Sequence, residues 1–99
     1  DFSLNDQTME IHYKSKLLDL TNAEYGILGY MIKKQGFVIS REDLIHNVSA
    51  INEESSNKSI DVMMGRIRNK LGEKSLIESI RGIGYKLLTA SNKTTLTNN

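Results

Sequence analysis

Basic side chains recur along one stretch of the sequence in a spacing that suits binding to a polyanion. Residues 57–71 have the 3.6-residue periodicity of a helix, with four apolar residues predicted to share a buried face: Ile60, Met64, Ile67 and Leu71. Arg66 lies near the middle of the opposite face, where a guanidinium can donate two hydrogen bonds to O6 and N7 of guanine. A phosphate contact or a solvated charge are the alternatives for Arg66.

Other residues of this helix suit a phosphate backbone. Lys58 and Ser59 stand at its start, where side-chain and backbone donors can hold a phosphate. Arg68 and Lys70 flank the exposed face and are predicted to bind phosphates, unless one of them pairs with an acid. The acidic candidates are Glu42 and Asp61. Val62 suits contact with a thymine methyl, although a single exposed valine needs no explanation.

A tight hairpin is predicted directly after the helix. Segments 76–80 and 85–88 read as strands around Arg81-Gly82-Ile83-Gly84, and the glycines are expected to supply the unusual φ of the turn. Arg81 would project from a thin hairpin, which is the geometry needed to enter a narrow minor groove. Tyr85 begins the returning strand, and either its hydroxyl reaches a phosphate or its ring only packs in the core.

The net charge supports a polyanionic partner once it is divided by position. Residues 1–55 carry five Lys/Arg against nine Asp/Glu, whereas residues 56–88 carry seven against three. This asymmetry predicts that one face meets a polyanion and the other does not. A solvated basic face without a partner is the alternative.

Length and composition indicate a single domain in a reducing, cytoplasmic setting, and the order of its expected strands and helices makes it α+β. The chain has 99 residues, 38% of them hydrophobic, and no cysteine, which excludes disulfides and thiolate metal sites. No signal peptide or membrane span is expected, and a first residue other than Met suggests a fragment of a longer protein. His12 and His46 are expected at the surface, with no catalytic or metal-binding spacing nearby, so neither an enzyme nor a metal or cofactor site is predicted.

The remaining elements would position the basic helix. Strands are expected at 2–4, 9–13 and 16–20, with Met9, Ile11 and Tyr13 on one buried face. A helix should open at Thr21, with Glu24 completing a capping box and Gly36 as its stop. Its buried stripe is predicted at Tyr25, Leu28, Met31 and Ile32.

A short second helix is expected after Ser40, with Asp43 as its box partner. Its buried face is predicted at Leu44, Ile45 and Val48. Residues 49–57 read as a loop, Gly72 should end the basic helix, and residues 89–99 are expected to be disordered. The organisation is therefore a sheet at 1–20, a three-helix core at 21–72 and a hairpin at 76–88, all within one domain at 1–88.

Several motifs in this order resemble the carboxy-terminal effector domain of OmpR/PhoB-type response regulators. They are Leu20-Thr21-x-x-Glu24-Tyr25-x-x-Leu28, Ser40-Arg41-Glu42-x-Leu44, Ser59-Ile60-Asp61-Val62, Arg66-Ile67-Arg68-x-Lys70-Leu71 and Ile80-Arg81-Gly82-x-Gly84-Tyr85. The resemblance covers roughly residues 2–88. It implies a winged helix-turn-helix with an amino-terminal antiparallel sheet, three helices and a carboxy-terminal hairpin wing.

The resemblance also implies a transcription factor of a bacterial two-component system, located in the cytoplasm and on the nucleoid when bound. Its partners would be double-stranded promoter DNA, bound by head-to-tail pairs on direct repeats, and an upstream phosphorylated receiver domain absent from this chain. RNA polymerase is a further expected partner, through a loop containing Ser49, Asn52, Glu53, Glu54 and Ser55. The expected DNA-contacting residues are Lys58, Ser59, Val62, Met63, Arg66, Arg68, Asn69, Lys70, Arg81 and Tyr85.

Two residues depart from the family pattern. Gly65 stands where the family often has a basic or polar residue, and Met63 stands where it often has a polar one. The helix is therefore expected to read bases with fewer side chains, with more weight on Arg66 and on DNA shape. The competing interpretations are a winged-helix module that binds protein, and the DNA-binding domain of a membrane-tethered regulator.

Overall fold

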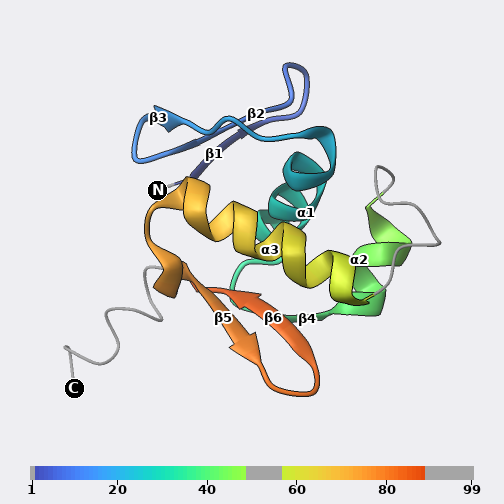
Figure 1. Cartoon of the computed structure of the whole chain (residues 1–99). Helices are drawn as coiled ribbons and strands as arrows, with labels where there is room; N and C mark the ends of the chain where they lie inside the picture. Colours follow the sequence, from blue (N-terminus) through green and yellow to red (C-terminus); the bar gives the residue numbers. More distant parts are fainter. Residues whose placement is uncertain (1, 49–56, 89–99) are drawn as a thin grey trace.

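The computed structural model describes residues 2–48 and 57–88, which form two small sheets around three helices (Figure 1). The elements in chain order are β1 (Phe2–Asn5), β2 (Glu10–Tyr13), β3 (Lys16–Leu17), α1 (Asn22–Lys33), β4 (Val38–Ser40), α2 (Arg41–Asn47), α3 (Asn57–Leu71), the 3-10 turn η1 (Lys74–Leu76), β5 (Ile77–Ile80) and β6 (Gly84–Leu87). This order confirms the predicted α+β class.

The amino-terminal sheet has the antiparallel order β1-β2-β3. Ile11 and Tyr13 are buried as predicted, but the prediction for Met9 was wrong, because its side chain is 50% exposed and its φ is 56°. Met9 belongs to the β1–β2 turn, in which the side chain of Asn5 accepts hydrogen bonds from the amides of Gln7 and Thr8. The third strand ends at Leu17, shorter than predicted.

Helix α1 begins as predicted and buries a slightly different face. Thr21 Oγ1 accepts from the Glu24 amide at 3.2 Å, and Glu24 Oε1 accepts from the Thr21 amide at 3.0 Å, which confirms the capping box. Leu28 and Met31 are fully buried, but so are Ile27 and the charged Glu24. The predicted Tyr25 and Ile32 are only partly buried against the core.

Strand β4 was not predicted from the sequence. Helix α1 ends at Lys33 with Lys34 as its C-cap, so the prediction that Gly36 stops the helix was wrong. Gly36, with a φ of 91°, instead turns the chain so that its amide donates to the Leu87 carbonyl at 2.9 Å. This turn directs Val38–Ser40 alongside β6. The carboxy-terminal sheet therefore has three strands in the order β4-β6-β5, and we call its projecting hairpin, residues 77–87, the wing.

Helix α2 follows β4 without a break. Ser40 Oγ accepts from the Asp43 amide at 3.0 Å, as predicted, but the Asp43 carboxylate accepts from Asn47 Nδ2 and Tyr30 Oη in place of closing a capping box. Leu44 and Val48 are buried, so α2 packs against the core by its predicted face.

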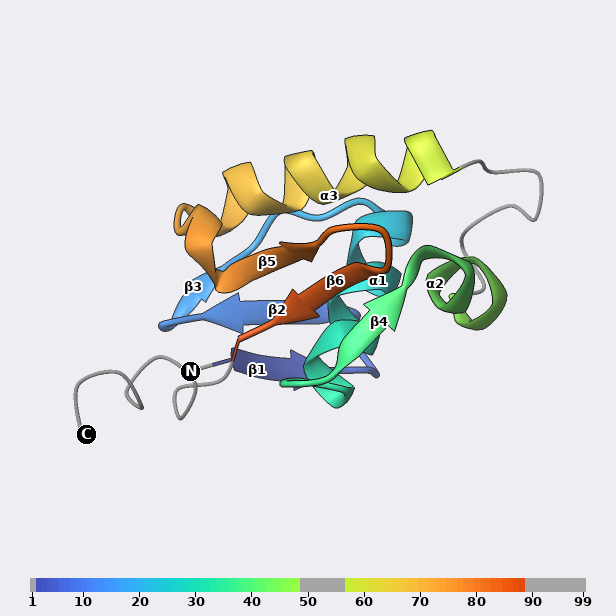
Figure 2. The same cartoon turned by 90° about the horizontal axis from the view of Figure 1, so that it is seen from below.

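Helix α3 lies along one side of the molecule, at the top of Figure 2, with the sheets and α1 below it. Its predicted apolar face is confirmed, since Ile60, Met64 and Ile67 are fully buried and Leu71 is 7% exposed. Gly72, with a φ of 81°, follows its last turn. The core thus fixes which face of α3 meets solvent.

The two glycines of the wing serve different purposes. Gly82 has a φ of 77°, as predicted for a turn, but Gly84 is not in a positive-φ conformation. A Cβ atom at Gly84 would lie 2.0 Å from the backbone oxygen of Ile39 and 2.8 Å from Cα of Ser40. Gly84 is therefore required because β4 and β6 approach closely, which corrects the prediction that it shapes the turn.

We expect Gly84→Ala to lower the free energy of unfolding by about 1–3 kcal/mol, the usual cost of overpacking. The matched control is Gly65→Ala, since nothing lies within 4 Å of a Cβ at Gly65. This control should raise stability by about 0.5–1 kcal/mol through helix propensity. Urea unfolding of both variants measures the difference, and equal effects would contradict the steric explanation.

Candidate nucleic-acid interface

The solvent-facing side of α3 is narrow. Arg66 and Asn69 are exposed, and the Val62 side chain is 49% exposed. Met63 is partly buried against the core, and Gly65 leaves open space where a side chain would stand. Asp61 is also exposed, so the exposed residues of α3 among the side chains described are Asp61, Val62, Arg66 and Asn69. The last three are spaced about one helical turn apart.

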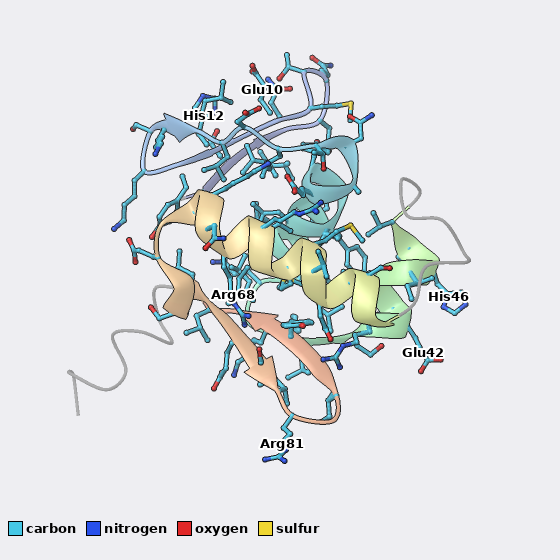
Figure 3. The ribbon with its side chains drawn as sticks, in the orientation of Figure 1. Glu10, His12, Glu42, His46, Arg68 and Arg81 are labelled. Atoms are coloured by element: carbon cyan, nitrogen blue, oxygen red, sulfur yellow. The ribbon has the colours of Figure 1, made fainter. Side chains whose placement is uncertain are left out.

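Arg81 extends from the tip of the wing. Figure 3 shows its side chain directed away from the body of the protein, and the residue is exposed. The turn beneath it is closed by the Ile83 amide, which donates to the Ile80 carbonyl at 2.9 Å. A thin hairpin therefore presents one guanidinium at its end.

Arg68 is partly buried and lies between α3 and the wing (Figure 3). Its Nη2 donates to the Ile77 carbonyl at 2.8 Å and to Ser79 Oγ at 2.7 Å, while its Nε donates to the same carbonyl at 3.2 Å. A guanidinium suits this task because its planar donors can reach several acceptors at once. The predicted phosphate ligand thus connects α3 to β5.

Lys70 forms an ion pair with the buried Glu24. Its Nζ lies 2.6 Å from Glu24 Oε1, and the Glu24 side chain is only 2% exposed. The same oxygen accepts the capping hydrogen bond from Thr21. Lys70 therefore pairs with an acid, which was the alternative to phosphate binding. Its partner, however, is neither Glu42 nor Asp61.

Burial by itself raises the pKa of Glu24, but hydrogen bonds from Lys70 and the Thr21 backbone outweigh it and leave the pKa below its ordinary value. A carboxyl whose pKa is lowered on folding stabilises the protein while it is ionised. This contribution is complete above the ordinary value of 4.5 and is lost as the pH falls through the lowered pKa.

Tyr85 is buried, with 4% of its surface exposed, and its hydroxyl donates to Asp61 Oδ1. Arg41 Nε donates to the same oxygen at 2.8 Å. The hydrogen bond from Tyr85 lowers the pKa of Asp61 against the opposing effect of burial, and the hydrogen bond and charge of Arg41 lower it further. The ring of Tyr85 therefore packs in the core, as one of the two alternatives predicted, and its hydroxyl is hydrogen-bonded within the protein.

The other residues singled out in the sequence differ in how far the structure describes them. Lys58 starts α3, but its side chain lies outside the part that the structure describes, as does the predicted polymerase loop with Ser49, Asn52, Glu53, Glu54 and Ser55. Ser59 is partly buried. His46 is exposed, and the half-exposed His12 lies on the outer side of the amino-terminal sheet (Figure 3).

No three His, Asp or Glu side chains within residues 2–48 and 57–88 gather closely enough to hold a metal ion. In the same ranges, no helix has both the length and the apolar character that crossing a membrane requires.

Sequence reasoning missed the partnerships of Arg41, Asp61 and Glu24, because each joins residues 20 or more positions apart. Only the capping motif pointed to Glu24.

A protein-family model described as "Transcriptional regulatory protein, C terminal" matches residues 15–87. The chain belongs to this family. It is a DNA-binding effector domain of the OmpR/PhoB response-regulator type, and the family is not enzymatic. The predicted winged-helix fold and DNA-binding class are thereby confirmed.

Individual relatives agree with this assignment. The response regulator ArlR of Staphylococcus saprophyticus is 37% identical over 71 residues, covering 69% of this chain and 32% of that protein. The transcriptional regulatory protein YkoG of Bacillus subtilis is 34% identical over 90 residues, covering 88% of this chain and 40% of that protein. The chain thus spans about two fifths or less of these relatives.

Among solved structures, the DNA-binding domain of the response regulator AdeR, in complex with an intercistronic region, superposes with a TM-score of 0.79. It is 26% identical, and the match covers 89% of this chain and 94% of that one.

We expect Lys70→Met to lower the free energy of unfolding at pH 7 by about 1–3 kcal/mol, because Glu24 is then buried without its cation. The deficit should shrink as the pH falls below 4.5, since a protonated carboxyl needs no cation. Thermal unfolding across pH measures both effects.

Two variants control this experiment. Lys86→Met removes the cation of an exposed pair, whose Nζ lies 3.6 Å from Glu78 Oε1, and should change stability little. Adding Glu24→Gln to Lys70→Met should recover stability, because the amide oxygen still accepts from Thr21. A deficit that stays constant with pH would contradict the assignment.

Proposed function

We propose that this domain binds double-stranded promoter DNA with α3 in the major groove and Arg81 in the adjacent minor groove. One observation supports this above all. Arg66 and Arg81 are exposed and form no hydrogen bond or ion pair with another described residue, whereas Arg68 and Lys70 are engaged internally. The two available guanidinium groups stand on the two elements that fit the two grooves.

The surrounding charge and the relatives support the same proposal. Residues 56–88 carry seven Lys/Arg against three Asp/Glu, so this part of the chain is attracted to phosphates. Val62 and Asn69 flank Arg66 by one turn and complete a small contact surface. AdeR, which shares the fold, was solved in complex with an intercistronic region.

The same proposal extends to the whole protein. We infer an upstream receiver domain that controls the domain through phosphorylation, because relatives such as ArlR are longer response regulators. The proposal for the whole protein further includes a cytoplasmic location and head-to-tail pairing on direct repeats. It also includes contact with RNA polymerase through residues 49–55, which lie outside the described residues.

We expect Arg66→Ala to weaken binding to the preferred site by about 1–3 kcal/mol and to flatten the preference at one base position. Arg81→Ala should reduce the preference for a narrow, A·T-rich minor groove beside it. Neither variant should lose stability, because both side chains are exposed. Selection of bound sites from random DNA, followed by titration, measures these changes.

The control for these variants is Lys70→Met, whose effect on DNA should follow its loss of stability and fall equally on all sequences. Equal, sequence-independent losses from Arg66→Ala and Lys70→Met would contradict base reading by Arg66. Binding that shows neither sequence preference nor sensitivity to salt would favour a protein-docking module instead.

Salt dependence provides a further test. If all seven cations of residues 56–88 neutralised phosphates, log K would fall with log salt with a slope of about −6 per domain. Arg68, Lys70 and Lys86 are engaged by Ser79, Glu24 and Glu78 respectively, so we expect a slope of about −4. A slope of about −6 would show that these contacts open on DNA.

A further inference from the structure

One carboxylate oxygen joins three separate elements beside the proposed DNA surface. Asp61 lies in the first half of α3, and its Oδ1 accepts from Arg41 Nε at 2.8 Å and from the hydroxyl of Tyr85. Arg41 is the first residue of α2, and Tyr85 lies in β6. Asp61 therefore connects α3 to α2 and to the wing through a single atom.

The ring of Tyr85 strengthens the same junction. The guanidinium of Arg41 lies over it at 5.2 Å and that of Arg68 at 5.5 Å, both within the range of a cation–π interaction. Arg68 continues to the Ile77 carbonyl and Ser79 Oγ in β5. We call Arg41, Asp61, Arg68 and Tyr85 the wing clamp.

Backbone pairing between strands does not by itself fix the position of the wing relative to α3. Strand β6 pairs with β4 and with β5, so the ladder hydrogen bonds hold the wing to the strand that follows α1. Among the described residues, the clamp side chains Asp61 and Arg68 both make hydrogen bonds from α3 to the wing. A change in the clamp can therefore shift the wing relative to α3 while both sheets stay paired.

The distance from α3 to the wing tip decides how Arg66 and Arg81 could act together. Two guanidinium groups on one rigid frame contact DNA with a fixed offset between the major-groove and minor-groove positions. If the frame loosened, each group would still bind, but the offset would no longer be specified. Pre-organisation of this kind improves specificity because fewer arrangements compete with the productive one.

We propose that Asp61 is a positioning residue that sets the offset between the two grooves by holding the wing to α3. This inference rests on the proposed function, because it gives the fixed offset a use in reading DNA. It assigns to Asp61 no contact with DNA of its own.

The first test measures the frame without DNA. The chain has no cysteine, so Asn69→Cys on α3 and Ile83→Cys at the wing tip, both exposed positions, can carry two spin labels. We expect the distance distribution between the labels to broaden in Asp61→Asn, which keeps the shape but weakens the acceptor, and in Tyr85→Phe, which removes only the hydroxyl. Glu78→Gln, which breaks a pair within the wing itself, is the matched control and should leave the distribution unchanged.

The second test measures selectivity with unlabelled protein. Sites selected from random DNA by Asp61→Asn should keep the base preference assigned to Arg66, while the preference at the minor-groove position should fall about fivefold, the factor equivalent to a coupling of 1 kcal/mol. A merely structural effect would weaken all positions equally. Tyr85→Phe should reproduce the split, and it serves alone if Asp61→Asn does not fold.

The outcomes separate the two proposals. Unchanged distance distributions in both variants, or an equal loss at all base positions, would overturn the positioning role of Asp61. If the unmodified domain selects no DNA sequence, the proposed function fails and the offset proposed for Asp61 falls with it. Broadened distances in that case would still show the clamp as a mechanical link, so the two failures are distinguishable.

Discussion

One buried carboxylate constrains how α3 sits in this domain. Glu24 is 1% exposed, and its Oε1 both caps α1 and accepts the ammonium of Lys70 in the last turn of α3. An ionised carboxylate so deeply buried must be paired, because its desolvation is otherwise uncompensated. Rotating α3 would remove Lys70 from Glu24 and Ile60, Met64 and Ile67 from the core at the same time. The apolar stripe and the ion pair therefore fix the same orientation.

The same orientation separates the cations of α3 and the wing into two groups. Arg68 and Lys70 point back into the protein, where they satisfy a carbonyl, a hydroxyl and a carboxylate. Arg66, about one helical turn before Lys70, is exposed to solvent. The number of basic residues therefore overstates how many cations are available at the surface, because Lys70 holds α3 to α1 and Arg68 holds it to the wing.

The sequence was sufficient for the features that depend on local chemistry. The Thr21–Glu24 capping box, the apolar stripe of α3 and the positive φ of Gly72 and Gly82 follow from residues within a few positions of each other. Strand β4 was missed because it has three residues, an exposed Val38, and a partner strand more than forty positions away. Met9 was misplaced because its positive φ interrupts the alternation that the sequence suggested.

The functional contacts were harder to predict for the same physical reason. The sequence does not distinguish a lysine that binds a phosphate from a lysine that pairs with a buried acid 46 positions away. Resemblance to the family singled out a set of residues but did not show whether each of them acts on DNA or within the protein. Only the three-dimensional arrangement shows that Tyr85 and Arg68 face inward.

Gly65 and Gly84 differ in whether packing requires a glycine at the position. At Gly84 the backbone oxygen of Ile39 excludes any side chain, so packing requires glycine. At Gly65 the space is open, and a larger residue would favour the helix. Packing therefore does not account for Gly65, and a surface without a side chain there lets the backbone of α3 approach a partner more closely. If α3 and the wing bind DNA as proposed, the few side chains on that face leave more of the discrimination to the fixed relation between α3 and the wing.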